Sequence, residues 1–121
     1  NLKNGTNYMD IKVWRGTFNY NGGITTVAMQ NTLAGNTTFG RTATGHYYVT
    51  NSAGGFTTNK TWAIFQNGRP VAPGYASDFS VVRSNNFVLG LFSGQVDMTL
   101  SDISLADDWA QNAKLEILVY P

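Results

Sequence analysis

The segment FNYNGGITT, residues 18–26, joins two strand-like runs through Asn21-Gly22-Gly23. Asparagine and glycine tolerate the positive φ angles that tight turns between antiparallel strands require. The run before the turn is Met9 to Tyr20, and the run after it is Ile24 to Leu33. The segment therefore predicts a β-hairpin, and the rest of the chain repeats this pattern of short runs separated by turn residues.

Further strand-like runs follow at short spacing. They are Thr37 to Thr42, Gly45 to Thr50, Lys60 to Gln66, Phe79 to Arg83, Phe87 to Ser93 and Lys114 to Tyr120. The last run alternates in polarity, with Leu115, Ile117 and Val119 on one face and Glu116 on the other. Ser84-Asn85-Asn86 separates the fourth run from the fifth and indicates a second hairpin. These runs predict an all-β, antiparallel domain, as a sandwich, a jelly roll or a small barrel.

Two segments lack a strand pattern. Arg69 to Ala76 contains Pro70, Pro73 and Gly74, which predicts a loop. Met98 to Asn112 has no apolar stripe long enough for a stable helix. It is expected to be irregular, with at most a helical turn capped by Ser101 or another over residues 105–110.

Size and composition limit the classes of protein to consider. A chain of 121 residues fits one domain, 1–121, which typically buries roughly 65% of the surface that its unfolded chain exposes. Position 1 is Asn rather than Met, so the chain is expected to be the C-terminal domain, or another fragment, of a longer protein. No cysteine is present, which excludes a thiol nucleophile and thiolate metal ligands.

Charge and hydropathy argue against two kinds of partner. The net charge is +1, charged residues make up 12% of the chain, and no Lys/Arg cluster exists, so nucleic acid is not an expected partner. No apolar run approaches the roughly 20 residues that a membrane-spanning helix needs, so membrane insertion is not expected.

The inventory of acid, base and nucleophile is poor. His46 is the only histidine, and the sequence has no Gly-x-Ser-x-Gly motif, although a triad with Ser52 and Asp78 is conceivable. Only 7 acidic residues exist, and Glu116 alone lies in the middle of a predicted strand, whereas glycoside hydrolysis needs two opposed carboxylates. A partly exposed strand histidine and a non-enzymatic protein are the expectation, with no catalytic residue, resident cofactor or metal.

Four aspartates gather in and beside the irregular segment: Asp97, Asp102, Asp107 and Asp108. Calcium prefers several oxygen ligands, so this is the best place in the chain for a calcium ion. The spacing matches no EF-hand loop and lacks its closing glutamate. Solvated loop acids are therefore preferred over a calcium site.

Aromatic residues are the remaining candidates for ligand contact, because sugar rings commonly stack on Trp or Tyr. The candidates by residue type are Tyr47, Tyr48, Tyr75, Trp62 and Trp109. Trp62 lies in TWAIF, a run that is apolar on both faces, and is expected to be buried in the core or in an interface. Trp109, in ADDWAQN, is the aromatic residue most expected to meet solvent or a partner.

Two runs are apolar on both faces: FVLGLF, residues 87–92, and ILVY, residues 117–120. One face of a two-layer antiparallel domain normally meets water and is polar. The pattern therefore suggests that neighbouring subunits cover these outer faces.

Several short motifs carry a family resemblance. In chain order they are QNTLAGN (Gln30 to Asn36), GHYY (Gly45 to Tyr48), GGFTTNKTWAIF (Gly54 to Phe65) and KLEILVYP (Lys114 to Pro121). From about residue 9 onward this succession resembles the C-terminal domains of bacteriophage tail or head fibre structural proteins. The departures are Ala34, inserted between Leu33 and Gly35, and Leu115 and Leu118 in the final strand.

The resemblance implies a non-enzymatic virion domain: a homotrimeric, jelly-roll-like β-sandwich at a fibre tip or capsid surface. Such domains often attach to host-cell glycans or outer-membrane proteins, and the family has no catalytic residues to carry over. The residues expected to contact a receptor, a glycan or a partner are Trp109, Tyr75, Tyr48 and His46. The alternative is a monomeric carbohydrate-binding module of a secreted bacterial protein, with a row of exposed aromatic residues.

Overall fold

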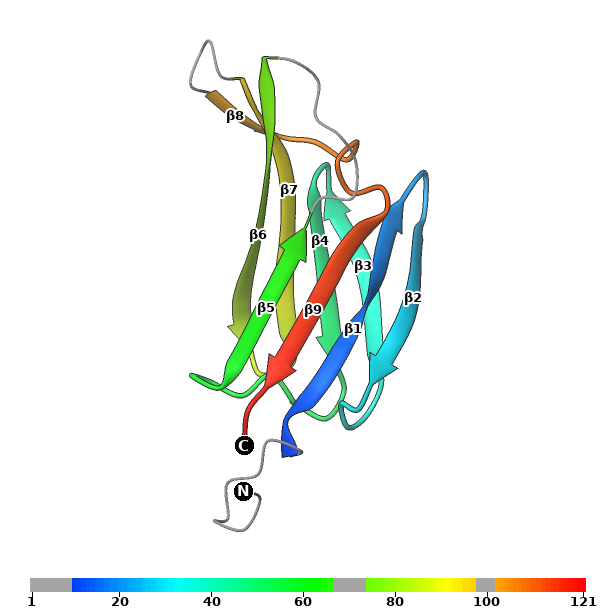
Figure 1. Ribbon diagram of the computed structural model, residues 1–121, viewed down its shortest axis with the longest axis vertical. Helices are drawn as coiled ribbons and strands as arrows, with labels where there is room; N and C mark the ends of the chain where they lie inside the picture. Colours follow the sequence, from blue (N-terminus) through cyan, green and yellow to red (C-terminus); the bar gives the residue numbers. More distant parts are fainter. Residues whose placement is uncertain (1–9, 67–73, 98–101) are drawn as a thin grey trace.

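The computed structural model describes residues 10–66, 74–97 and 102–121, and within these ranges it contains nine β-strands and no α-helix (Figure 1). The strands are β1 (Lys12–Tyr20), β2 (Ile24–Asn31), β3 (Thr37–Ala43), β4 (His46–Asn51), β5 (Thr61–Gln66), β6 (Tyr75–Asn85), β7 (Val88–Asp97), β8 (Asp102–Leu105) and β9 (Ala113–Val119). Sheet A has the order β2-β1-β9-β5, and sheet B has the order β3-β4-β7-β6 with β8 paired to β7. Every pairing is antiparallel, and the two sheets pack into a β-sandwich, as the strand pattern predicted.

Both predicted hairpins are present. The first joins β1 to β2, with Tyr20 opposite Ile24 and Gly22 at a φ of 75°, a conformation that glycine adopts at little cost. The second joins β6 to β7, but the turn lies at residues 86–87, because Ser84 and Asn85 of the predicted turn belong to β6, and its strands are longer than the sequence indicated. Tyr75 and Ala76, predicted to lie in a loop, are the first residues of β6. The rest of that predicted loop, through residue 73, lies outside the described residues.

The strands β4 and β5 belong to different sheets, so residues 52–60 cross from one layer to the other. Asn51, which is 1% exposed, joins the start of this crossing to the segment that precedes β3. Its Nδ2 atom donates to the carbonyl oxygen of Ala34 at 2.8 Å, and its Oδ1 atom accepts from the N–H groups of Ala53 and Gly55. A buried amide whose donor and acceptor are both used fixes the loop without an unsatisfied polar group.

The core lies between the sheets and is rich in aromatic rings. Phe18 of β1 is fully buried, and its ring centroid lies 5.1 Å from that of Tyr47 and 5.4 Å from that of Phe65. Both contacts are edge-to-face, the arrangement that the ring quadrupoles favour. The predicted alternation of β9 is confirmed: Leu115, Ile117 and Val119 are buried in this core, and Glu116 faces outward.

The segment from residue 98 to 112 differs from its prediction. Residues 102–105 form β8, which pairs with β7, so the helical turn expected after Ser101 is absent there. Residues 106–112 are irregular, as expected, and contain no helical turn. In Figure 1, β6, β7 and β8 extend beyond the end of sheet A. Residues 98–101 lie outside the described residues.

No helix suited to crossing a membrane, by length and apolar character, occurs in the part of the chain that the structure describes.

Gly45, which precedes β4, is a position where only glycine fits. Its φ is 66°, and an added Cβ would lie 2.3 Å from the carbonyl oxygen of Ser93 and 2.7 Å from the amide nitrogen of Ala106. Gly45→Ala is expected to lower the free energy of unfolding by about 2–5 kcal/mol, because left-handed backbone strain adds to steric overlap. Chemical denaturation measures the change.

Gly23→Ala is the matched control, because an added Cβ at Gly23 would meet nothing within 4 Å. Its effect should stay within about 0.5 kcal/mol. Equal stability of the two variants would contradict the packing of β4 against the segment that follows β8.

Candidate functional site

The structure separates the four residues predicted to contact a ligand or partner. His46 and Tyr48 lie together on β4, and their side chains are half-buried on the outer face of sheet B. Tyr75 is 40% exposed at the start of β6. The residue of β6 at the level of His46 is Ser80, through Phe92 of β7, and Tyr75 lies five residues from Ser80, about 16 Å away at the usual strand rise. Only His46 and Tyr48 can therefore belong to one compact site.

Trp109, predicted to meet solvent, is only 8% exposed. The reason is that its irregular segment is held against the end of the sandwich. The N–H of Tyr20 donates to the carbonyl oxygen of Ala110 at 2.7 Å, and Ala110 itself is fully buried. The sequence showed the neighbouring polar residues but not this docking, so the prediction of an exposed Trp109 was wrong.

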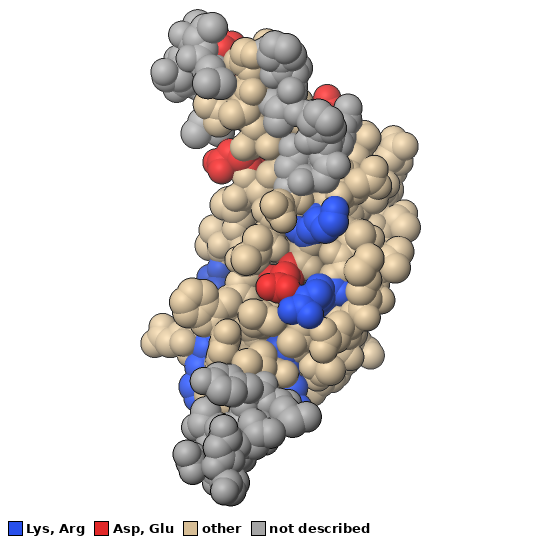
Figure 2. Space-filling view, viewed as in Figure 1, with Lys and Arg blue, Asp and Glu red and all other residues tan. Residues whose placement is uncertain are grey.

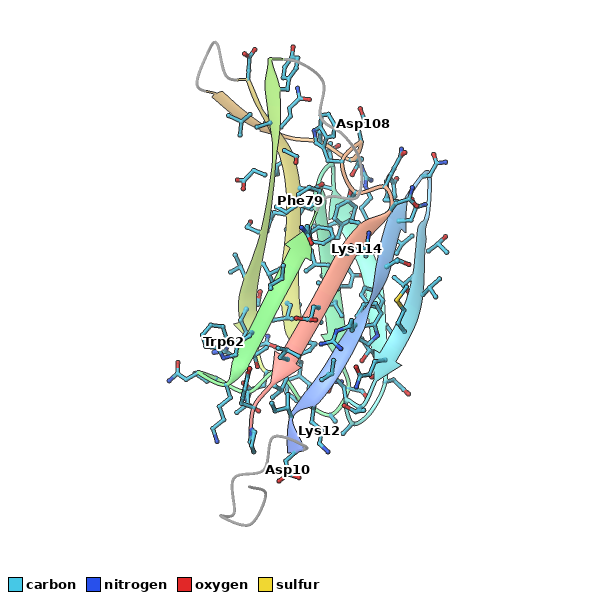
Figure 3. The ribbon with its side chains drawn as sticks, in the orientation of Figure 1. Asp10, Lys12, Trp62, Phe79, Asp108 and Lys114 are labelled. Atoms are coloured by element: carbon cyan, nitrogen blue, oxygen red, sulfur yellow. The ribbon has the colours of Figure 1, made fainter. Side chains whose placement is uncertain are left out.

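Trp62, predicted to be buried in the core or in an interface, is 65% exposed on the single chain, so it does not lie in the core. Along β5, Phe65 is buried and Ala63 half-buried, whereas Trp62 and Ile64 face outward. Because β5 is an edge strand, no further strand of the sheet shelters its outward residues among the described ranges. Figure 3 shows Trp62 at the outer margin of the molecule, and its ring meets that of Tyr120 at 6.4 Å.

His46, Tyr48 and Phe92 form the aromatic platform, a group of rings on the outer face of sheet B. Tyr47 and Val49 of β4 are fully buried in the core, so the alternating side chains of His46 and Tyr48 point to the other face. His46 is the cross-strand partner of Phe92 in β7, and their rings stack with centroids 4.3 Å apart and planes 18° from parallel. The platform is thus built from two neighbouring strands.

Two glycines next to the platform give its rings room. Gly40 and Gly90 flank Tyr48 on the neighbouring strands. A Cβ at Gly40 would lie 2.1 Å from the Tyr48 hydroxyl oxygen, and a Cβ at Gly90 would lie 3.1 Å from Phe92. The Tyr48 and Phe92 rings therefore lie close to glycine residues of the sheet, where a larger residue would displace them.

A shallow hollow of about 180 Å³ adjoins the platform. It is lined by Asp78, Ser80, Phe92, Ser93, Gly94 and Leu105. The exposed carboxylate of Asp78 and hydroxyl of Ser80 lie in β6 directly opposite Gly94 and Phe92. The hollow thus combines an aromatic ring, a carboxylate, a hydroxyl and an aliphatic side chain, which suits a small polar molecule with one apolar face.

Sequence reasoning missed Phe92 and Ser80, and it considered Asp78 only as a conceivable triad partner of His46. Phe92 lay in a run apolar on both faces, which indicated only that something covers it. The cross-strand register places His46 on that ring, and a single sequence does not specify register between distant strands.

Asp107 forms a clamp that holds the irregular segment to sheet B. Its carboxylate accepts hydrogen bonds from the Tyr47 hydroxyl and from the N–H of Gly45, the latter at 2.8 Å. The Arg41 guanidinium pairs with the second carboxylate oxygen at 2.8 Å and also lies over the Tyr20 ring, 5.0 Å from its centroid. Asp107 is therefore a structural residue.

The clamp shifts the pKa values of its members. Burial alone would raise the pKa of Asp107, but the hydrogen bonds from Arg41, Tyr47 and Gly45 outweigh it, so the pKa is lowered. Burial, and then the hydrogen bond to Asp107, raise the pKa of Tyr47. The hydrogen bond to Asp107 raises the pKa of Arg41. These directions keep Asp107 ionised and Tyr47 protonated at neutral pH.

The clamp bears on the calcium hypothesis. Because three donors already occupy the Asp107 carboxylate, it is a poor candidate for a metal ligand. Asp97 and Asp102 are partners in the backbone register of the β7–β8 pair. No group of three or more His, Cys, Asp or Glu residues suited to a metal ion occurs within residues 10–66, 74–97 and 102–121.

Asp107→Asn tests the clamp through the pH dependence of stability. A carboxylate whose folded pKa is lowered stabilises the fold above its unfolded pKa, about 3.9, and that stability is lost as the pH falls through the folded pKa. At pH 7 the variant should be less stable by about 1–3 kcal/mol, because the charge is lost and the amide nitrogen that replaces one carboxylate oxygen cannot accept the hydrogen bond from Arg41. The difference should shrink toward pH 3, as followed by denaturation at each pH.

Asp10→Asn is the matched control, since Asp10 is exposed and lies at the opposite end of the molecule from Asp108, the neighbour of Asp107 (Figure 3). It should track the unmodified chain at every pH. If the free energy of unfolding of Asp107→Asn changed with pH in parallel with that of the unmodified chain, Asp107 would not be the cause of the loss of stability in acid.

Comparison of the chain with family models, with curated proteins and with solved structures found no match.

Proposed function

We propose that the chain is a non-enzymatic virion structural domain, a homotrimeric jelly-roll-like module at a fibre tip or capsid surface that attaches to host-cell glycans. The observation that carries the attachment part is the aromatic platform with its flanking carboxylate and hydroxyl, on the outer face of sheet B. The virion part is supported by the motif resemblance together with the all-β sandwich.

The motifs of the resemblance coincide with positions that the fold depends on. GHYY supplies Gly45 and Tyr47 to the Asp107 clamp and two rings to the platform. KLEILVYP contains β9, which pairs with β1, so the first and last strands lie side by side at the centre of sheet A. This adjacency is a jelly-roll-like feature. Shared motifs at such positions support a shared architecture.

The platform has the chemistry to hold a saccharide. The C–H face of a sugar ring can pack on Tyr48 or on the Phe92–His46 stack, and its hydroxyls can donate to Asp78 and exchange hydrogen bonds with Ser80. The carboxylate of Asp78 disfavours an anionic ligand at close range. The expected ligand is therefore a neutral sugar of a cell-surface glycan.

A second candidate function is a monomeric carbohydrate-binding module of a secreted bacterial protein. The exposed Trp62, with Tyr120 beside it, favours this reading, because a protruding indole is a typical stacking surface for sugars. The two candidates share glycan binding and differ in oligomeric state and in which aromatic residues bind.

Glycan binding is tested with a glycan array, followed by titration of the best neutral ligand. Phe92→Ala and Tyr48→Ala are each expected to weaken binding by roughly tenfold, which corresponds to the loss of about 1.4 kcal/mol of stacking. Tyr75→Ala, an exposed aromatic residue remote from the platform, is the matched control and should bind as the unmodified chain does. Thermal unfolding of each variant checks that the fold is retained.

Loss of binding in Trp62→Ala, with the platform variants unaffected, would move the site to β5 and favour the second candidate. A chain that binds no glycan would overturn the attachment role.

Oligomeric state is tested by light scattering on a size-exclusion column. A homotrimer is expected, with a mass near three times 13.2 kDa. A monomer across a range of concentrations would contradict the trimeric module and support the secreted binding module instead.

A further inference from the structure

The most exposed large apolar side chains on the outer face of sheet A lie on its two edge strands. On β2, Val27 is 55% exposed and Met29 is 72% exposed. On β5, Trp62 is 65% exposed and Ile64 is 61% exposed. Exposed apolar residues grouped in this way mark an interaction surface.

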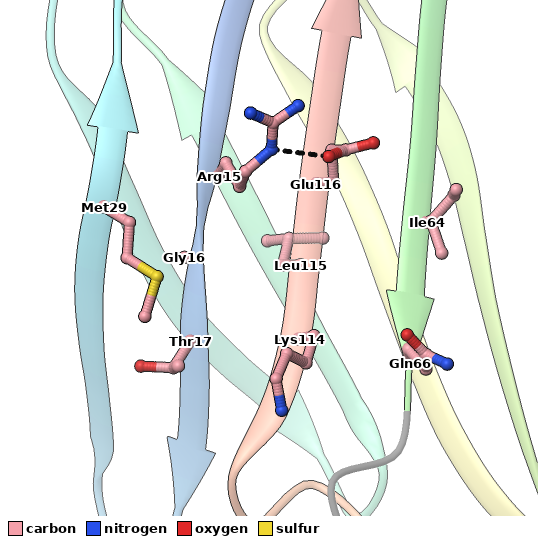
Figure 4. A pocket seen from close by; sticks show the side chains of 9 residues that line it. All are labelled: Arg15, Gly16, Thr17, Met29, Ile64, Gln66, Lys114, Leu115 and Glu116. Atoms are coloured by element: carbon pink, nitrogen blue, oxygen red, sulfur yellow. Dashed lines mark hydrogen bonds and ion pairs between the residues drawn. The ribbon is translucent and has the colours of Figure 1, made fainter.

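Between the two edges, the middle of the same face is polar, whereas Val13 and Leu118 form an apolar cross-strand pair nearer one end. Arg15 of β1 and Glu116 of β9 form an ion pair with 2.6 Å between Nε and Oε2, and Thr17 and Lys114 lie beside it (Figure 4). A groove of about 300 Å³ runs between these residues and is bordered by Met29 on one side and Ile64 on the other. Figure 2 shows charged side chains in the middle of this view with uncharged surface to their right.

This distribution argues against stacking of two copies face to face. Such a contact would remove the central charges from water, and desolvation of an ion pair costs as much as, or more than, the attraction returns. A contact at the edges would bring the apolar residues together and leave the centre solvated.

The edges of sheet A carry few of the features that prevent pairing, apart from a β-bulge at Met29 of β2. Neither β2 (ITTVAMQN) nor β5 (TWAIFQ) contains a charged residue or a proline. In sheet B, by contrast, the edge strand β6 carries Asp78 and Arg83, and β3 carries Arg41. Charges and prolines on edge strands are the usual means of preventing association through unpaired backbone groups.

The directions of the two edges are complementary. β2 is antiparallel to β1, β1 to β9, and β9 to β5, so β2 and β5 run in opposite directions. The β2 edge of one copy can therefore join the β5 edge of the next as an antiparallel pair that contains the β-bulge at Met29. In an antiparallel pair the residue numbers increase along one strand and decrease along the other. One register therefore places Val27 opposite Ile64 and Met29 opposite Trp62.

We propose that copies of this chain associate edge to edge, with β2 of one copy pairing with β5 of the next, and that three copies close into a ring. This contact is heterologous, since it joins two different surfaces, and such contacts form rings when the rotation closes. Backbone hydrogen bonds extend sheet A across the interface, and the four apolar side chains pack across it. The inference rests on the homotrimer of the proposed function and specifies its interface.

Disulfide trapping tests this geometry, because the chain has no cysteine of its own. The double variants Val27→Cys/Ile64→Cys and Met29→Cys/Trp62→Cys should each form covalent trimers under mild oxidation, seen on a non-reducing gel. Within one copy, β2 and β5 are three strand spacings apart, about 14 Å, which exceeds the roughly 7 Å limit for a disulfide. Any such bond therefore joins two copies.

Thr17→Cys is the matched control at the centre of the same face, and it should form covalent dimers only if copies stack face to face. Val27→Lys and Ile64→Lys should shift the mass from trimer to monomer, whereas Thr17→Lys should leave it trimeric. All of these positions are half-buried or exposed, and circular dichroism checks that each variant is folded.

The outcomes distinguish failure of the proposed interface from failure of the proposed homotrimer. A trimeric mass without edge cross-links overturns the edge-to-edge contact and leaves the homotrimer standing. A monomeric mass overturns both. Edge cross-links that continue into longer ladders support the strand pairing but overturn closure at three copies.

Discussion

Tyr47 connects the three parts of the molecule on which its form depends. Its ring packs edge-to-face on Phe18 and so joins sheet B to sheet A in the core. Its hydroxyl donates to Asp107 and so holds the irregular segment over the end of the sandwich. Because side chains alternate along a strand, burying Tyr47 also forces His46 and Tyr48 onto the outer face. Core, clamp and platform therefore follow from the orientation of one strand.

Local signals predicted most of the fold. The Asn-Gly-Gly turn fixed the β1–β2 hairpin, and the alternation from Leu115 to Val119 identified both the strand and its buried face. Each of these features depends on residues close together in the chain. The existence of strands was more predictable than their lengths: β6 and β7 both extend past the predicted ends, because their mutual pairing continues beyond the sandwich.

Features set by distant pairing were not predictable. Trp109 is buried and Trp62 does not lie in the core, since exposure depends on which strand lies at an edge and on which loop docks on the core. β8 is only four residues long and exists through its pairing with β7. The site was predictable in part: His46 and Tyr48 were identified from residue type, whereas Phe92, Asp78 and Ser80 join them through register alone.

In this structure, a strand that is apolar on both faces does not by itself indicate a subunit interface. FVLGLF suggested an outer face covered by a neighbouring subunit, yet His46 of the same chain stacks on Phe92 and the Tyr48 ring lies over Gly40. In β9, Leu118 is half-buried beside its strand partner Trp62. Central strands thus obtain cover from cross-strand neighbours within the chain. An edge strand lacks a neighbour on one side, and this is where Val27, Met29, Trp62 and Ile64 stay exposed. Association is therefore better sought at the edges of the sheet than over the strands whose sequences are most apolar.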